Sequence, residues 1–137
     1  MRDVNVGGTR NVIAACQRHN VSRLVFTSSS SVVFEGRDLI NVDEHAPYAQ
    51  RPMDFYSDTK AEAERLVLAA NSRRLKTCAL RPASVFGEGD PLFVPSLVAN
   101  ARAGKNKYFL GSGRNMTDFT YVGNIAAAHV QVRWMCA

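Results

Sequence analysis

The residues in this sequence best suited to acid–base chemistry are a tyrosine and a lysine four positions apart. Tyr56 and Lys60 fall in a segment of strong helix formers, so their spacing places both side chains on one face of a predicted helix. The positive end of the helix dipole and the charge of Lys60 both favour a phenolate. A tyrosine in such surroundings can act as a general acid or base near neutral pH.

A run of hydroxyl side chains precedes this helix. Four serines, Ser28 to Ser31, directly follow Arg23–Thr27, an apolar segment that is predicted to form a buried strand. Their hydroxyls could hydrogen-bond the oxygen whose proton Tyr56 exchanges. Together these groups suit reversible proton transfer to an alcohol or a carbonyl while a cofactor carries hydride.

The tyrosine–lysine spacing is a weak signal by itself. With four lysines and four tyrosines, a chain of this length contains Tyr-x-x-x-Lys by chance in roughly one case in eight. A tyrosine at a helix start is also commonly an ordinary surface residue. The serines at the strand end, the order of the segments and the Arg81-Pro82 pair after the next strand favour the catalytic interpretation.

Helices and strands are predicted to alternate along the chain. Apolar spacing indicates helices over residues 4–19, 55–71, 95–103 and about 123–132, with Asp3 and Asp54 as N-caps of the first two. Buried strands are predicted at 23–27 and 77–80, and weaker strand or loop segments at 109–113 and 118–122. Residues 34–54 and 82–92 contain many turn-forming residues and predict long connections.

This order predicts an α/β fold built on a doubly wound parallel sheet, because strands separated by helices form βαβ crossovers. Ligands of such sheets bind outside the carboxyl ends of the strands. The rule places the serines after Thr27 and the loop after Leu80 at the same edge of the sheet. We therefore expect the functional site at that edge.

Composition excludes several classes of protein. A content of 46% hydrophobic residues is too high for a disordered segment, and no apolar run approaches the roughly 20 residues of a membrane span. No signal-peptide pattern is visible. The net charge of +5 comes without a basic stripe, so we expect solvated surface or, second, steering of an anionic ligand, and no nucleic-acid partner. Spacing predicts neither disulfides nor a metal site from Cys16, Cys78, Cys136, His19, His45 and His129.

At this point the sequence resembles the extended short-chain dehydrogenase/reductase superfamily. The segment 4–12 (VNVGGTRNV) is similar to its Asn-containing helix, and 24–29 (LVFTSS) followed by 56–60 (YSDTK) is similar to its Ser and Tyr-x-x-x-Lys active site. The segment 80–87 (LRPASVFG) is similar to its strand-to-loop segment beside the nicotinamide. The resemblance covers about residues 4–131 and implies a Rossmann-like fold.

Within that superfamily the chain most resembles the 3β-hydroxysteroid dehydrogenase/isomerase family, and there the decarboxylating sterol-4α-carboxylate 3-dehydrogenase type. The resemblance rests on 27–36 (TSSSSVVFEG), 56–60, 94–97, 101–105 and 118–122 (DFTYV). It implies NAD- or NADP-dependent oxidation of the 3β-hydroxyl of a steroid or sterol. For a 4α-carboxysterol, the resulting β-keto acid would lose carbon dioxide.

The resemblance also implies roles for individual residues. Tyr56 would be the catalytic acid/base, and Lys60 would assist it and hold the nicotinamide ribose. Ser29 would hydrogen-bond the substrate oxygen, with Ser30 and Ser31 as alternatives because an all-serine run leaves the alignment open. Three further positions match supporting or cofactor-contacting residues of the family, namely Asn5, Thr27 and Pro82.

The match leaves out the phosphate-binding part of such a fold. No glycine-rich GxGxxG turn between a strand and a helix is present, and no residue that would read the cofactor ribose, so NAD and NADP are not distinguished. We therefore expect a single partial domain over residues 1–137 that lacks the first βα units. About 1–90 would form the cofactor and catalytic part, and about 91–137 the start of the substrate-binding part.

Partners and location follow only from the resemblance. It implies a steroid or sterol substrate, the endoplasmic reticulum membrane or its cytosolic face, membrane association through parts outside this sequence, and a homodimer as an option. Two alternatives stay open at this stage. One is another extended short-chain dehydrogenase, of the nucleotide-sugar epimerase or dihydroflavonol reductase type; the other is an inactive fragment that acts only as an interaction module.

Several other polar residues receive structural interpretations. Glu62 and Glu64 are expected to be solvated residues of the helix, and His129 a surface or packing residue. Arg81 suits a substrate or cofactor contact and a structural ion pair about equally. Asp90, in the loop over the expected site, is more plausibly structural than functional.

The missing glycine-rich turn leads to a first prediction. We expect the purified 137-residue chain not to bind NAD(P)H measurably, because its sequence lacks the turn that holds the cofactor pyrophosphate. Titration with NAD(P)H followed by nicotinamide fluorescence checks this. A dissociation constant in the micromolar range would contradict it.

Overall fold

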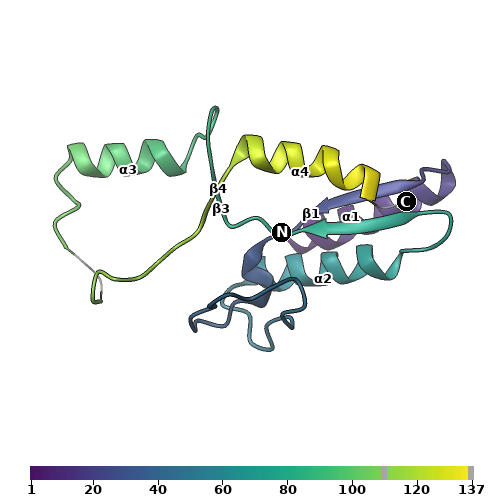
Figure 1. Ribbon diagram of the computed structural model, residues 1–137, viewed down its shortest axis with the longest axis horizontal. Helices are drawn as coiled ribbons and strands as arrows, with labels where there is room; N and C mark the ends of the chain where they lie inside the picture. Colours follow the sequence, from purple (N-terminus) through teal and green to yellow (C-terminus); the bar gives the residue numbers. More distant parts are fainter. Residues whose placement is uncertain (109–110, 136–137) are drawn as a thin grey trace.

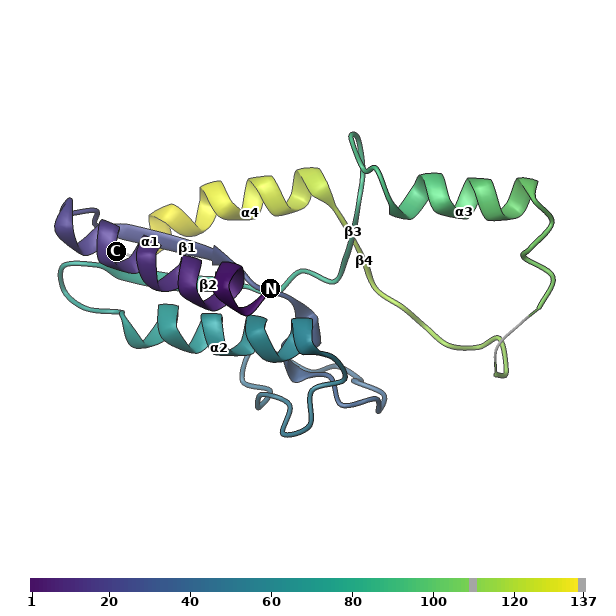
Figure 2. The ribbon, with the colours of Figure 1, turned by 180° about the vertical axis from the view of Figure 1, so that it is seen from behind.

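The computed structural model describes residues 1–108 and 111–135. Two parallel strands, β1 (Arg23–Thr27) and β2 (Lys76–Leu80), pair in the register Arg23↔Lys76 to Thr27↔Leu80. In both ribbon views α2 (Phe55–Ala69) lies on one side of these strands and α4 (Val122–Met135) on the other (Figures 1 and 2). The predicted α/β fold with parallel strands and crossover helices is confirmed.

The first helix starts earlier than predicted. A π-helical turn, η1 (Asp3–Gly7), continues directly into α1 (Gly8–Arg18), and Arg2 already has helical backbone angles (φ −58, ψ −44). The predicted N-cap Asp3 is therefore wrong, because an N-cap residue needs an extended backbone and Asp3 lies inside the helix. The helix ends one residue before its predicted bound at residue 19, and the left-handed backbone of Asn20 (φ 55) turns the chain out of it.

The core forms where η1 and α2 meet the sheet. Val6 of η1 is 2% exposed, and Ala63 and Val67 of α2 are fully buried. Val4 and Val12 face outward instead and line a cleft beside β1. The buried side of α2 also carries polar residues, Ser57, Thr59 and Glu64, which must be satisfied by hydrogen bonds within the protein.

The long connection between the serines and α2 is held by its own polar contacts. After the short 3-10 helix η2 (Ser30–Val33), the amide of Ala49 donates to the carbonyl of Val32 (2.9 Å). The Glu35 carboxylate accepts hydrogen bonds from the amides of Gln50 and Arg51. These bonds fold residues 34–54 into a lobe below α2 in Figure 1.

The later part of the chain contains a second pair of parallel strands. β3 (Ser84–Phe86) pairs with β4 (Phe119–Tyr121), so the prediction of an unbroken loop over 82–92 is wrong. A three-residue strand is too short to show a recognisable alternation, which explains the miss. The segment 118–122 does contain a strand, as one of the two options predicted. Of the segment 109–113, residues 109–110 lie outside the described residues, and 111–113 form a turn and a bend.

Helix α3 (Phe93–Arg102) lies away from the first strand pair in both views (Figures 1 and 2). It begins two residues before the predicted start because the Asp90 carboxylate accepts hydrogen bonds from the amides of Leu92, Phe93 and Val94 (2.9–3.1 Å). Asp90 thus has a structural role here. None of the residues of α3 is buried.

A glycine is required where β3 ends. Gly87 has φ +146, and a Cβ there would lie 2.4 Å from Val122 Cγ1 at the start of α4. Any side chain would therefore clash with α4 in addition to straining the backbone. In the part of the chain that the structure describes, no helix is long and apolar enough to cross a membrane.

Candidate active site

The carboxyl ends of β1 and β2 bring the predicted site segments together. Beyond the strand pair, the amide of Ser28 donates to the carbonyl of Leu80 (2.7 Å) and the amide of Ser30 donates to the carbonyl of Pro82 (3.0 Å). The serine run therefore continues alongside the segment after β2. The prediction that these two segments share one edge of the sheet is confirmed.

Tyr56 and Lys60 lie in the first half of α2, which packs against this edge. Tyr56 is 41% exposed. Lys60 Nζ donates to the carbonyl oxygen of Thr27 (2.6 Å) and lies 4.4 Å from the centre of the Phe26 ring. The ammonium is thus held at the last residue of β1. Burial lowers the pKa of Lys60, and the negative charge of Glu64 opposes this shift.

The start of α2 is set by a side-chain cap. Asp54 has an extended backbone, and its Oδ1 accepts a hydrogen bond from the amide of Ser57 (2.7 Å), as the sequence predicted. This bond holds the pKa of the Asp54 carboxyl below its ordinary value. The cap therefore fixes where the turn that carries Tyr56 begins.

Loss of this cap should destabilise the fold. We expect Asp54→Ala to lower the thermal midpoint at neutral pH by roughly 3–6 °C, and Asp54→Asn to lower it less, because asparagine also caps helices. Since the folded-state pKa is depressed, the contribution of the carboxylate is present above the ordinary pKa and is lost as pH falls through the folded value. Thermal unfolding by circular dichroism across the acidic range checks both statements. An Asp54→Ala penalty that persists unchanged at low pH would contradict the role of the carboxylate.

Asn5 is placed against the same helix. Its Nδ2 donates to Thr59 Oγ1 (2.9 Å), and the Thr59 hydroxyl donates to the carbonyl of Tyr56 (3.0 Å). Asn5 also lies in the π-turn η1, and its carbonyl accepts a hydrogen bond from the Thr9 hydroxyl (2.6 Å). Wide π-turns are frequent at functional sites. The structure thus connects Asn5 to the backbone of the turn that carries Tyr56.

The serines are organised by one hydrogen bond between their side chains. Ser29 Oγ lies 2.9 Å from Ser31 Oγ and accepts the amide of Ser31 (3.2 Å), which makes Ser29 the N-cap of η2. Both side chains are half-buried. Ser29 therefore stands at the sheet edge next to the segment that follows β2, and the assignment of a role among Ser29, Ser30 and Ser31 stays a prediction.

Thr27 has a second partner that the sequence did not indicate. Its Oγ1 lies 2.7 Å from Nε2 of His129 on α4, while Nδ1 of His129 lies 2.8 Å from the carbonyl of Ile125. Because a carbonyl only accepts, Nδ1 of His129 donates to Ile125, and Nε2 shares the hydrogen bond with the Thr27 hydroxyl. No spacing in the sequence links two residues 102 positions apart. This bond ties α4 to the end of β1.

A cleft of about 470 Å³ opens beside β1. It lies between the N-terminal part of the first helix and the strand, and Lys60 reaches it from α2. Its lining is mostly apolar and includes Val4, Asn5, Gly8, Thr9, Val12, Leu24, Val25, Phe26, Thr27, Lys60 and Val67. Three of the predicted site residues, Asn5, Thr27 and Lys60, therefore border one cavity.

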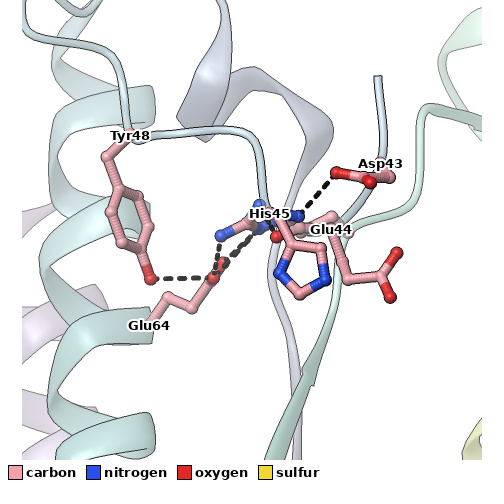
Figure 3. A network of polar contacts seen from close by, with 6 residues as sticks. Asp43, Glu44, His45, Tyr48 and Glu64 are labelled. Carbon is pink, nitrogen blue, oxygen red and sulfur yellow. Dashed lines mark hydrogen bonds and ion pairs between the residues drawn. The ribbon is translucent and has the colours of Figure 1, made fainter. Parts of the chain in front are cut away.

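Glu64 differs most from its predicted place. It is 1% exposed, whereas the sequence suggested a solvated residue, so that prediction is wrong. Its carboxylate accepts from Arg81 Nε (2.9 Å) and Nη2 (2.7 Å), and from the Tyr48 hydroxyl (2.9 Å). Of the two roles predicted for Arg81, the structure therefore shows the structural ion pair. Figure 3 shows Tyr48 and Glu64 pointing toward each other, with residues 43–45 of the connection nearby.

Glu62 behaves as expected for an outer-face residue. Its carboxylate pairs with Arg2 and Arg10 on the first helix, and a quarter of its side chain is exposed. The two glutamates are two positions apart, which is 200° around a helix, so they face opposite sides of α2.

Comparison with known proteins finds relatives with similar sequences. The chain is 57% identical over 129 residues to 3beta-hydroxysteroid-dehydrogenase/decarboxylase isoform 1 of Arabidopsis thaliana, covering 93% of this chain and 29% of that protein. It is 46% identical to the human decarboxylating sterol-4-alpha-carboxylate 3-dehydrogenase, covering 93% and 35%. The chain thus spans about a third of the length of these curated relatives.

Solved structures show the same fold. A dTDP-glucose 4,6-dehydratase from Bacillus anthracis in complex with NAD matches with a TM-score of 0.76 and 28% identity over 93% of this chain and 41% of that one. The UDP-glucose 4-epimerase of Thermus thermophilus in complex with NAD matches with a TM-score of 0.71 and 30% identity over 94% and 45%. The model of the 3-beta hydroxysteroid dehydrogenase/isomerase family matches residues 1–134. The chain therefore belongs to the 3-beta hydroxysteroid dehydrogenase/isomerase family, as its motifs predicted.

Proposed function

We propose that this chain carries the catalytic groups of an NAD(P)-dependent dehydrogenase that oxidises the 3β-hydroxyl of a sterol with a 4α-carboxylate. The observation that carries the proposal is the bond of Lys60, on the helix of Tyr56, to the carbonyl of Thr27 directly before the serine run, in a chain 45–57% identical to sterol and steroid dehydrogenases that decarboxylate. The nucleotide-sugar epimerase alternative is not favoured, since epimerase and dehydratase structures that match this chain are only 20–30% identical to it.

The residues present fit the nicotinamide-ribose end of the cofactor. Lys60 places a cation at the carboxyl end of β1, where it borders an apolar cleft, and Tyr56 is exposed on the preceding turn. Thr27 and Pro82 end the two segments that meet there. We propose that these four residues contact that end of the cofactor. When bound, NAD(P)⁺ supplies the acceptor for the hydride from C3 of the sterol.

The roles of the protein groups follow from their chemistry. As the C3–H electron pair leaves as hydride, Tyr56 accepts the proton of the 3β-hydroxyl and a C3 carbonyl forms. Ser29 donates a hydrogen bond to the same oxygen, and the Lys60 ammonium stabilises negative charge on Tyr56. The resulting β-keto acid then breaks its C4–carboxylate bond. That electron pair forms an enolate, carbon dioxide leaves, and C4 is protonated.

We further propose that the two parts of the chain have different roles. Residues of about 1–90 would provide the cofactor and catalytic part, and about 91–137 would begin the substrate-binding part. In support, the proposed catalytic residues all lie in the first part, while α3 lies away from β1 and β2 (Figure 1). The endoplasmic reticulum membrane and a homodimer stay predictions from the family, to be checked by cell fractionation and by sedimentation.

A chimera tests the activity. This chain replaces the matching segment of the Arabidopsis relative, of which it covers 29%. We expect a 4α-carboxy-3β-hydroxysterol to give NAD(P)H, a 3-ketosterol and carbon dioxide in equal amounts. The same sterol without the carboxylate should give NAD(P)H and ketone alone. A chimera that folds but leaves both sterols unchanged, or that acts on a nucleotide sugar instead, would overturn the proposal.

A further inference from the structure

The buried carboxylate of Glu64 lies one helical turn after Lys60. Residues four apart on a helix are neighbours on its surface, so Glu64 extends the face that carries Lys60. A carboxylate that is 1% exposed is costly unless it is fully paired. The groups that contact Glu64 therefore show how its charge is compensated in the interior of the protein.

Two groups from other segments donate hydrogen bonds to this carboxylate. Arg81, the first residue after β2, donates two hydrogen bonds from one edge of its guanidinium (2.7 and 2.9 Å). Tyr48 donates a third from the long connection, and its ring stacks with the guanidinium groups of Arg65 (4.2 Å) and Arg81 (5.1 Å). Burial alone would raise the pKa of Glu64, but its interactions with Arg81, Ser28 and Tyr48 outweigh burial and hold the pKa below its ordinary value.

This contact joins the segments that carry the candidate catalytic groups. Glu64 belongs to the helix of Tyr56 and Lys60, and Arg81 directly precedes Pro82. Arg81 Nη1 also reaches the carbonyl of Glu44 (3.4 Å) in the connection that runs from the serines to α2. A charged, bidentate pair tolerates little rotation or sliding of the helix.

We propose that Glu64, through its pair with Arg81, is a positioning residue for Lys60: it locks α2 against the end of β2 and places a fixed negative charge one turn from the ammonium. The role rests on the proposed function, in which Lys60 supports Tyr56. Glu64 touches neither substrate nor cofactor in this assignment. It acts through the helix and through its charge.

A titration of Lys60 in the 137-residue chain tests this without requiring activity. The four lysines can be followed by their Cε resonances, and Lys60→Arg assigns the relevant one. We expect Glu64→Gln to move the pKa of Lys60 further below its ordinary value, because the carboxylate that opposes the effect of burial is lost. Glu62→Gln is the matched control on the opposite face of the same helix and should leave Lys60 unchanged.

Unfolding would shift the pKa of Lys60 in the opposite direction. A Lys60 exposed by unfolding returns upward to the ordinary lysine pKa, so a downward shift in Glu64→Gln separates positioning from simple loss of fold. If Glu64→Gln fails to fold, the pKa of Lys60 is measured instead in the double variant Glu64→Gln with Arg81→Gln. This variant leaves no unpaired buried charge. A Lys60 pKa at or above the wild-type value in a folded variant overturns the proposal.

Kinetics in the chimera provide a separate readout. We expect Glu64→Gln to lower kcat about 10- to 100-fold with little change in the KM for the sterol, while Glu62→Gln stays near the parent. An unchanged kcat in Glu64→Gln would also overturn the proposal. If the parent chimera itself is inactive, the proposed function fails, and the Lys60 titration still decides on Glu64.

Discussion

Tyr56→Phe is expected to lower kcat for sterol oxidation by about 10³-fold, with little effect on binding of the sterol. The substitution removes only the hydroxyl that exchanges the proton with the 3β-oxygen. Because Tyr56 is 41% exposed, loss of its hydroxyl leaves no buried polar group unpaired and should not disturb the fold. Steady-state formation of NAD(P)H by the chimera measures the effect.

A matched control separates chemistry from packing. Tyr108→Phe removes the same atom from a side chain that is 87% exposed and far along the chain, so its kcat should equal that of the parent. The thermal midpoints of both variants should also match the parent. A Tyr56→Phe chimera that retains more than about a tenth of the parent kcat would remove Tyr56 from its proposed role.

Lys60→Met should have the second-largest effect, a loss of about 10²-fold or more in kcat. Methionine keeps an apolar side chain of similar length but removes the ammonium, which lies over the Phe26 ring and donates to the carbonyl of Thr27. The loss therefore tests the charge more than the packing. Activity of the chimera at neutral pH measures it.

The pH dependence of Lys60 has a defined sign. The protonated ammonium is the active form, so activity falls as pH rises through the pKa of Lys60. Burial lowers that pKa, so the alkaline limb of the profile should lie below the range of an ordinary lysine. Lys60→Arg keeps its charge at higher pH and should move the alkaline limb upward. A profile identical in the parent and in Lys60→Arg would show that Lys60 does not control this limb.

Much of the fold could be predicted from local patterns. The strand Arg23–Thr27 has the predicted bounds, and α2 starts at the predicted residue because Asp54 caps it. These elements depend on apolar runs and on a cap within three residues of its partner. β3 and β4 were harder to predict from the sequence because each has only three residues. Each is stabilised by pairing with the other, 30 or more positions away along the chain.

Glu62 and Glu64 show why the rest of the site could not be predicted. Both stand among alanines in one helix, and their local surroundings in the sequence are nearly the same. One pairs with arginines on the outer face, and the other is buried against Arg81. Which face of α2 is covered depends on where β2 ends, and no spacing within the helix contains that information.

Local patterns in the sequence indicated the candidate catalytic groups and the family. Tyr56, Lys60 and the serine run are local patterns, and their order along the chain indicated a parallel sheet and a dehydrogenase family that the comparisons confirm. The tertiary structure alone decided the partners of these groups. The bonds of Lys60 to Thr27, of Thr27 to His129 and of Glu64 to Arg81 span 17 to 102 positions. Such contacts form only when helices pack on strands, because burial then forces each polar group to find a partner that the local sequence does not specify.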